Sequence, residues 1–184
     1  MHAIGARRRQ KIPKAGGDVE PGLGSVCGSN VGTETFPAGT HLAAVEGDTE
    51  TGFVRVLRFV AVDDVGNVVN PLIVDGQIHG GVAQGIGEAL FEEMAYDDDG
   101  NLVTSSFSEL TIPAASDLPP FVTDRTCTPS PATPLGSKGV GEAGAIGSLP
   151  AVVNAVHDAV RHLGVRDLDV PCTPERVWRA LTMA

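Results

Sequence analysis

The sequence predicts an α+β domain, on the strength of three observations. Two neighbouring segments are rich in β-branched residues, a longer segment repeats its apolar residues every three or four positions, and two more helical patterns stand near the C-terminal end. The resulting order of strand, strand, helix, strands, loop, helix, helix lacks the regular alternation of a doubly wound fold. With 184 residues, 42% of them apolar, the chain is long enough for one domain with an ordinary core.

The first predicted elements are two strands between about residues 40 and 64. THLAAVEGD and FVRVLRFVAVDD are rich in β-branched residues, and the turn residues DTETG between them predict a hairpin. Residues 1–35 show no periodicity and contain scattered glycine and proline, so we expect a poorly ordered leader or the edge of a truncated segment. Residues 36–184 are therefore predicted to form the domain.

A glycine-rich helix is predicted over about residues 72–94. Ile78, Val82 and Ile86 recur every four residues, although each glycine in the segment costs about 1 kcal/mol relative to alanine in a helix interior. Such a cost is usually compensated by the close approach of another backbone or of a ligand. One face of the helix combines two carboxamides, two glycines and a carboxylate, namely Gln77, Gly80, Gly81, Gln84 and Glu88. Two interpretations stay open for this face: helix packing through small residues, which is preferred without other information, and contact with a ligand.

The second half of the chain predicts further strands and two helices. Extended segments are expected at residues 104–113 and 119–128. A helix with Ser148 as its N-cap ends at Gly164, and a last helix begins after the N-cap Thr173. In the first of these helices, one face is lined by Val152, Val153, Val156, Val160 and Leu163. The second is expected to bury Val177, Trp178 and Leu181.

Charge and cysteine content exclude several classes of protein. The formal net charge of −10 repels a phosphate backbone, so nucleic acid is not expected as a partner. No stretch approaches ~18 consecutive apolar residues, so no membrane span is expected. Cys27, Cys127 and Cys172 form no C-x-x-C pair, which argues against a disulfide framework and against a metal centre inside the chain. Cysteines that form no disulfides are typical of a reducing compartment. The basic residues 7–9 are not followed by an apolar stretch, so an export signal is not supported, and a cytoplasmic protein is predicted.

The residues with the clearest chemical potential lie in one loop. Residues 139–144 read GVGEAG and match the G-x-G-x-x-G pattern of dinucleotide-binding folds, but the prolines before them exclude the buried strand that such a site requires. A P-loop is excluded as well, because Lys138 lacks the required preceding glycine. Glu142 remains, a carboxylate among glycines that let the backbone approach a ligand, and hence a candidate general base. The alternative is a solvated surface charge.

Four strings of the sequence resemble one family closely. They are FPAGTHLAAVEGDTETG, VDDVGNVVNPLIVDGQIHGGVAQGIGEALFEEMAYDDDGNL, SELTIPAASDLPPF and TPSPATPLGSKGVGEAGAIGSLPAVVNAVHDAV. In order and spacing they are similar to the C-terminal part of the molybdopterin-binding large subunit of the molybdenum hydroxylases, the family of xanthine dehydrogenase, aldehyde oxidase and carbon monoxide dehydrogenase. The resemblance implies the fold of that molybdopterin-binding domain from about residue 36 to the end.

The resemblance also implies roles for individual residues. Glu142, in the GVGE string, matches the active-site base of the family. Gln77, the glutamine of the G-Q-x-x-G-G string, matches a residue that contacts the molybdenum cofactor, and Gly80 and Gly81 complete that string. The residues that match the loop lying against the pterin are Lys138, Gly139, Val140 and Gly141. No side chain of this chain is expected to ligate the metal.

By the same resemblance, the expected cofactor is a molybdenum–molybdopterin in its cytosine dinucleotide form, with iron–sulfur clusters and FAD on partner subunits. The implied reaction is the oxidation of a small substrate, an aldehyde, an N-heterocycle or carbon monoxide, with oxygen from water. Large subunits of this family are several times longer than this chain, which is therefore interpreted as a truncated or split subunit. It is expected to be inactive without the remaining large-subunit portion. The alternative is a non-catalytic remnant or assembly module that makes only protein contacts.

Overall fold

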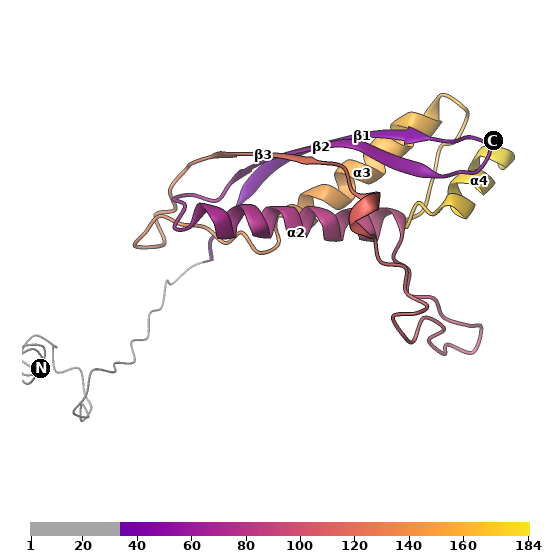
Figure 1. The fold of residues 1–184 in the computed structure, drawn as a ribbon, viewed down its shortest axis with the longest axis horizontal. Helices are drawn as coiled ribbons and strands as arrows, with labels where there is room; N and C mark the ends of the chain where they lie inside the picture. Colours follow the sequence, from indigo (N-terminus) through magenta and orange to yellow (C-terminus); the bar gives the residue numbers. More distant parts are fainter. Residues whose placement is uncertain (1–33) are drawn as a thin grey trace, which may run out of the picture. The chain divides into compact units, whose positions relative to one another are not determined.

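The computed structural model describes residues 34–184 (Figure 1). These residues form a mixed sheet with helices packed against it, which confirms the α+β class predicted from the order of elements. The elements are β1 (Ala38–Gly47), β2 (Val54–Asp64), α2 (Pro71–Leu90), a 3-10 turn (Ala115–Asp117), β3 (Phe121–Thr126), α3 (Ala143–Arg161) and α4 (Pro174–Met183). The leader or truncation edge predicted for residues 1–35 falls, except for its last two positions, outside the described residues.

The sheet has the strand order β1-β2-β3. β1 and β2 form the predicted antiparallel hairpin, whereas β3 returns through α2 and pairs parallel to β2. On the inner face, one row joins Ala43, Phe59 and Phe121, and Phe59 is fully buried. The pairing of β1 with β2 shifts by one residue, which leaves Leu57 without a partner on β1. This bulge explains why the buried positions of β2 change from even to odd numbers along the strand.

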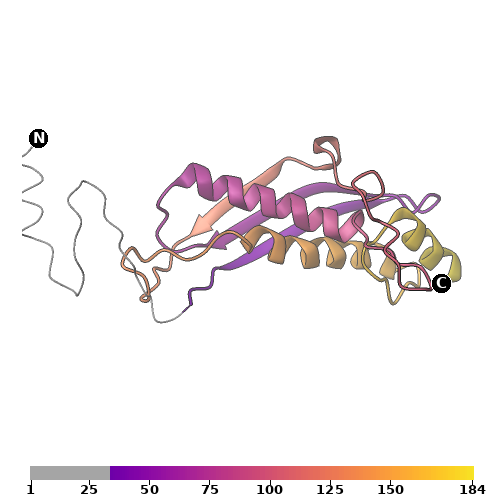
Figure 2. The same ribbon diagram turned by 90° about the horizontal axis from the view of Figure 1, so that it is seen from below.

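The helices α2 and α3 lie side by side against one face of the sheet (Figure 2). The helix α2 begins at Pro71, one residue before the predicted start. The Asn70 side chain caps it by accepting a hydrogen bond from the Ile73 N–H at 3.3 Å, and Pro71 occupies the first turn. Its apolar residues at steps of four are fully buried, as predicted. The large buried side chains of the core include Phe59, Ile78, Val82, Ile86, Val152 and Val156.

Small residues let α2 and α3 pack very closely. A Cβ added to Gly81 would lie 2.9 Å from the Gly144 Cα, and a Cβ on Gly85 would overlap the Ser148 hydroxyl. The packing interpretation of the glycine-rich helix is therefore confirmed at these two positions. Gly80 differs, since a Cβ there would meet no atom within 4 Å.

The helix α3 begins before Ser148, the residue predicted as its N-cap. Glu142 is the N-cap, and Ser148 is fully buried in the helix, with its hydroxyl within hydrogen-bonding distance of the Ala145 carbonyl (3.4 Å) and the Gly81 carbonyl (3.5 Å). The prediction was wrong because the early residues of α3 have low helix propensity on their own, and their contact with α2 stabilises the helical conformation. The helix ends at Arg161, shortly before the predicted Gly164.

Three further predictions need correction. The helix α2 ends at Leu90, four residues before the predicted end at residue 94. Just after Leu90, the N–H groups of Phe91 and Glu92 both donate to the Gly87 carbonyl. Residues 104–113 form turns and irregular backbone instead of a strand. Trp178, expected to be buried, is 45% exposed, because α4 covers the core mainly through Val177. The second expected extended segment, residues 119–128, contains β3 as predicted.

The helix α4 closes the end of the sheet that carries the β1–β2 turn. The Thr173 side chain caps it by accepting from the Arg176 N–H, as its sequence predicts. Just before the helix, the Cys172 N–H donates to the Ala89 carbonyl at 2.7 Å, which ties this segment to the end of α2. Among the helices of residues 34–184, none combines the length and the apolar character that a membrane span needs.

Candidate functional site

Asp64, at the end of β2, organises the loop that precedes α3. Asp64 is 8% exposed as a whole residue, and its carboxylate accepts hydrogen bonds at 3.0 Å from the Thr128 N–H, the Lys138 ammonium group and the Gly66 N–H. Thr128 first, and then Lys138, hold the pKa of Asp64 far below its usual range. An ionised carboxylate therefore joins two segments of the chain at the base of the loop.

The backbone of the same loop is bound to the turn after β2. The Lys138 N–H donates to the Val65 carbonyl at 2.8 Å, and Gly66 forms an isolated bridge with Ser137. Gly66 has a φ of +66°, and a Cβ on it would overlap the Gly136 carbonyl, so only glycine fits at this turn. Lys138 is consequently fixed through both its side chain and its backbone.

The structure brings together the two groups of residues that the sequence analysis singled out. Gln77 lies on the exposed side of α2, and a Cβ added to Gly141 would lie 3.8 Å from its Nε2 atom. Gly141 directly precedes Glu142, so the carboxamide of Gln77 stands beside the loop that contains the candidate base. Val140 is partly buried against the hydrophobic core and anchors the middle of this loop.

Glu142 is held by its backbone while its side chain is exposed. Its carbonyl accepts the Ile146 N–H at 3.0 Å in the first turn of α3, and its carboxylate makes no capping hydrogen bond. A side chain that contributes nothing to the capping of its own helix remains available to another molecule. This arrangement suits proton transfer at the carboxylate.

Open glycines border Gln77 and the loop. A Cβ placed on Gly76, Gly80 or Gly139 would meet no atom of the described residues within 4 Å. The backbone is therefore accessible on α2 and on the loop, as it must be where a flat ligand lies against main-chain groups. Gly81 belongs to a different surface, because α3 covers it.

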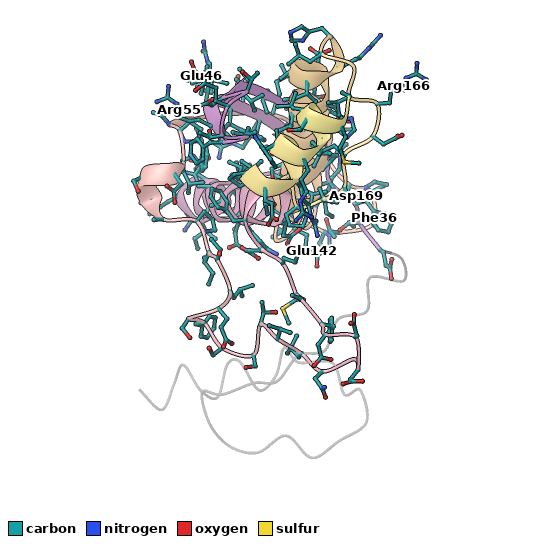
Figure 3. All side chains as sticks on the ribbon, turned by 90° about the vertical axis from the view of Figure 1, so that its right-hand side faces the viewer. Phe36, Glu46, Arg55, Glu142, Arg166 and Asp169 are labelled. Atoms are coloured by element: carbon teal, nitrogen blue, oxygen red, sulfur yellow. The ribbon has the colours of Figure 1, made fainter. Side chains whose placement is uncertain are left out.

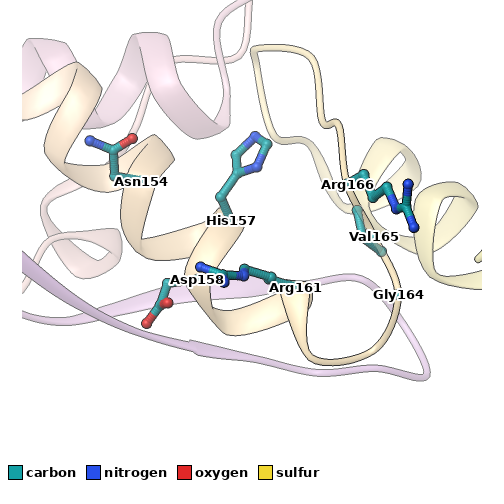
Figure 4. A pocket seen from close by; sticks show the side chains of 7 residues that line it. All are labelled: Asn154, His157, Asp158, Arg161, Gly164, Val165 and Arg166. Atoms are coloured by element: carbon teal, nitrogen blue, oxygen red, sulfur yellow. The ribbon is translucent and has the colours of Figure 1, made fainter.

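A hollow lies at the C-terminal end of α3, away from the loop that contains Glu142 (Figure 4). It has a volume of about 600 Å³ and is lined by residues of α3 and of the segment after it, most of them polar, namely Asn154, His157, Asp158, Arg161, Gly164, Val165 and Arg166. His157 is already bonded to the Leu168 carbonyl at 3.2 Å. From Glu142 to His157 the helix rises by about 22 Å, so this hollow is separate from the glycine-rich loop.

A buried histidine–aspartate pair that the sequence did not predict lies beside the candidate site. His41 Nε2 lies 3.2 Å from Asp63 Oδ1, and both side chains are almost completely buried, at 3% and 2% exposure. The pair lines a groove of about 380 Å³ between the start of β1 and the first turns of α3. Two adjacent aspartates at the end of an apolar strand were the available signal. Within residues 34–184, no three His, Cys, Asp or Glu side chains cluster as a metal site would require.

The fold and the site together define a small α+β domain with a glycine-lined surface, a carboxamide and a carboxylate exposed on it. A family model described as "Molybdopterin cofactor-binding domain" matches residues 20–119. The chain belongs to this family, which forms part of the large subunits of molybdenum hydroxylases.

Individual relatives agree with this assignment. The chain is 43% identical over 169 residues to the carbon monoxide dehydrogenase large chain of Hydrogenophaga pseudoflava, and the match covers 92% of this chain and 21% of the relative. It is 46% identical over 161 residues to the nicotine 6-hydroxylase large subunit of Paenarthrobacter nicotinovorans, covering 88% and 20%.

A solved structure shows the same fold. The match to quinoline 2-oxidoreductase from Pseudomonas putida 86 has a TM-score of 0.75 and 48% identity, and it covers 77% of this chain and 18% of that one. The chain thus spans about a fifth of the length of the relatives that it matches.

Proposed function

We propose that this chain supplies the glutamate-bearing wall of a molybdenum hydroxylase active site. The observation that supports this proposal most directly is the contact between Gln77 on α2 and Gly141, the residue before Glu142. A cofactor-facing carboxamide and a candidate base come from segments far apart in the sequence and meet on one exposed surface. A chance surface glutamate would not require that arrangement.

The residues present fit a molybdopterin. Gly80 and Gly139 leave the backbone open to a flat ring system, and Gln77 offers both a donor and an acceptor. In this proposal the cofactor, in its cytosine dinucleotide form, lies against these residues and against the loop Lys138–Gly141, while Gly81 sets the close approach of α3. When bound, molybdenum supplies the two-electron redox chemistry.

Glu142 is proposed as the general base. Its carboxylate accepts a proton as oxygen derived from water is transferred to a small substrate, which is an aldehyde, an N-heterocycle or carbon monoxide. The relatives include a carbon monoxide dehydrogenase and a nicotine 6-hydroxylase, so both carbon monoxide and N-heterocycles are represented among them. The proposed partners are the remaining large-subunit portion and subunits that contain iron–sulfur clusters and FAD.

The test is Glu142→Gln in a complex assembled with the remaining large-subunit portion and its partner subunits. Glutamine keeps the size and hydrogen bonding of the side chain but cannot act as a base. We expect unchanged molybdenum content and a turnover per bound molybdenum that is lower by roughly 10² or more. Glu50→Gln, an exposed glutamate in the β1–β2 turn, is the control and should keep the wild-type rate. Equal rates for both variants would favour the assembly-module interpretation instead.

A further inference from the structure

The loop that contains Glu142 is held at both ends by consecutive residues of one strand. Asp63 and Asp64, at the end of β2, are 2% and 8% exposed, and they are the only acidic residues buried to this degree within residues 34–184. Successive side chains of a strand point to opposite faces of the sheet. The two carboxylates therefore reach different segments of the chain from adjacent positions.

Asp64 holds the N-terminal end of the loop. Its Oδ1 atom accepts from the Lys138 ammonium at 3.0 Å, and the two side chains are 11% and 14% exposed. The Lys138 backbone is fixed as well, by its hydrogen bond to the residue after Asp64. Lys138 stands four residues before Glu142, so the start of the loop has little freedom to move.

Asp63 acts on the other end of the loop through His41. His41 Nε2 lies 3.2 Å and 3.3 Å from the two Asp63 oxygens, and the ring packs edge-on against Phe59 at 5.7 Å. The other nitrogen, Nδ1, is buried without a hydrogen-bond partner among the described residues. It lies against Gly147 in α3, where a Cβ would overlap the imidazole ring.

This steric contact fixes the first turns of α3 against β1. The buried Nδ1 atom gains no hydrogen bond there, which costs stability, so the ring contributes its shape and not its hydrogen-bonding capacity to α3. Gly147 lies five residues after Glu142, the N-cap of the same helix. The position of the helix N-terminus therefore depends on the His41–Asp63 pair.

We propose that Asp63 and Asp64 are positioning residues that hold Glu142 from both sides, Asp64 through Lys138 and Asp63 through His41 and Gly147. The inference rests on the proposed function of Glu142 as a base. In this arrangement, one short segment of β2 sets where the Glu142 carboxylate stands, although neither aspartate touches it. Loss of either contact should loosen the loop without unfolding the sheet.

The first test is backbone hydrogen exchange on the full chain, combined with urea unfolding. Asp64→Asn and Lys138→Met should each raise exchange at residues 139–146 by about tenfold or more. Exchange of the β1 and β2 amides should rise no further than the loss of global stability measured by urea unfolding requires. The double variant should resemble the single variants, because both remove the same contact. Unchanged exchange in the loop, or an equal rise at all amides, would overturn the proposal.

The second contact, from Asp63 through His41 to Gly147, is tested by its own variants and a matched control. Asp63→Asn should raise exchange in the same loop. Gly147→Ala, which displaces His41 and leaves the Asp63 carboxylate in place, should raise exchange in the loop as well. This variant tests the contact through His41 even if Asp63→Asn does not fold. Glu46→Gln breaks an exposed ion pair with Arg55 (2.7 Å) that lies well away from Glu142 (Figure 3), and it should leave the loop unchanged. A loop that responds equally to Glu46→Gln would contradict a specific role for the buried pair.

The assembled complex distinguishes positioning from a purely structural role. Asp64→Asn should keep the molybdenum content and the KM while kcat per bound molybdenum falls several-fold. An unchanged kcat together with increased loop exchange would overturn the positioning role. If instead Glu142→Gln has no effect on turnover, the proposed function fails, whatever the exchange rates show. The two failures are therefore distinguishable.

Discussion

At the scale of single residues, Asp64 links the stability of the chain to the site. Its carboxylate is ionised in the folded protein because it accepts hydrogen bonds from Thr128, Lys138 and Gly66. An unfolded chain has no such donors in place, so its aspartates titrate near ~3.9. A folded-state pKa below the unfolded value means that the unfolded chain binds more protons, and stability then rises with pH.

We therefore expect the contribution of Asp64 to be fully present above about pH 4 and to be lost as the pH falls toward the folded-state pKa. Asp64→Asn should lower the urea midpoint at neutral pH. Between pH 4 and pH 2, the urea midpoint of the variant should fall less than that of the wild type. The measurement is urea unfolding of the wild type and the variant across this range. Glu46→Gln, which removes an exposed carboxylate of an ion pair, is the control. Parallel curves for wild type and Asp64→Asn would show that Asp64 is not responsible.

At the scale of elements, the crossing of α2 and α3 sets the position of the site. Gly81 and Gly144 form this crossing, whereas Gly80, one residue away on α2, faces open space. The two adjacent glycines of the G-Q-x-x-G-G string thus serve different surfaces. Gly81 determines how close the helices come, and Gly80 leaves room beside Gln77.

The two glycines should respond to alanine with opposite signs. Gly80→Ala adds a methyl group where nothing obstructs it, and its better helix propensity should stabilise the chain by up to about 1 kcal/mol. Gly81→Ala forces a Cβ to within 2.8 Å of the Ala145 backbone nitrogen and should destabilise by about 1–3 kcal/mol. Urea unfolding of both variants measures the difference. Equal destabilisation would show that Gly80 is also packed, and the open surface beside Gln77 would then not exist.

The same contrast explains how far the elements could be predicted from the sequence. The β1–β2 hairpin and the caps of α2 and α4 follow from local signals, a turn between β-branched segments and Asn70 and Thr173 before prolines. The start of α3 does not, because its glycines favour a helix only when α2 lies against them. Nor could the parallel pairing of β3 with β2 be predicted, since it depends on the path of the chain through α2.

The candidate site was predictable only in its parts. The glycines around Glu142 and the spacing of Gln77 and Gly80 identify two candidate ligand-facing segments in the sequence. Their meeting at Gly141 is a tertiary contact without a local signal. The roles of Asp63 and His41 depend on burial and on a contact with α3, which the strand pattern alone does not reveal.

At the scale of the whole molecule, the site is an open surface. Gln77, Gly139 and Glu142 are all exposed. A site for a large cofactor normally buries about 70–90% of the surface of its ligand, and a single exposed wall cannot do so. The relatives that match this chain are about five times as long. Most of the polypeptide that could enclose a cofactor in those relatives therefore lies outside the part that matches these 184 residues.

We therefore predict that the 184-residue chain, purified alone, folds but contains no stoichiometric molybdenum. Gln77 and the loop before Glu142 provide contacts on one side of a cofactor, and the free energy of a few such contacts does not offset the loss of translational and rotational freedom on binding. Metal analysis and nucleotide release on the chain alone, and on the chain co-produced with the remaining large-subunit portion, give the comparison. Molybdenum should appear only in the second sample, and Gly80→Leu should reduce it there because a branched side chain would occupy the open surface beside Gln77. Stoichiometric molybdenum in the chain alone would mean that this single wall suffices to bind the cofactor.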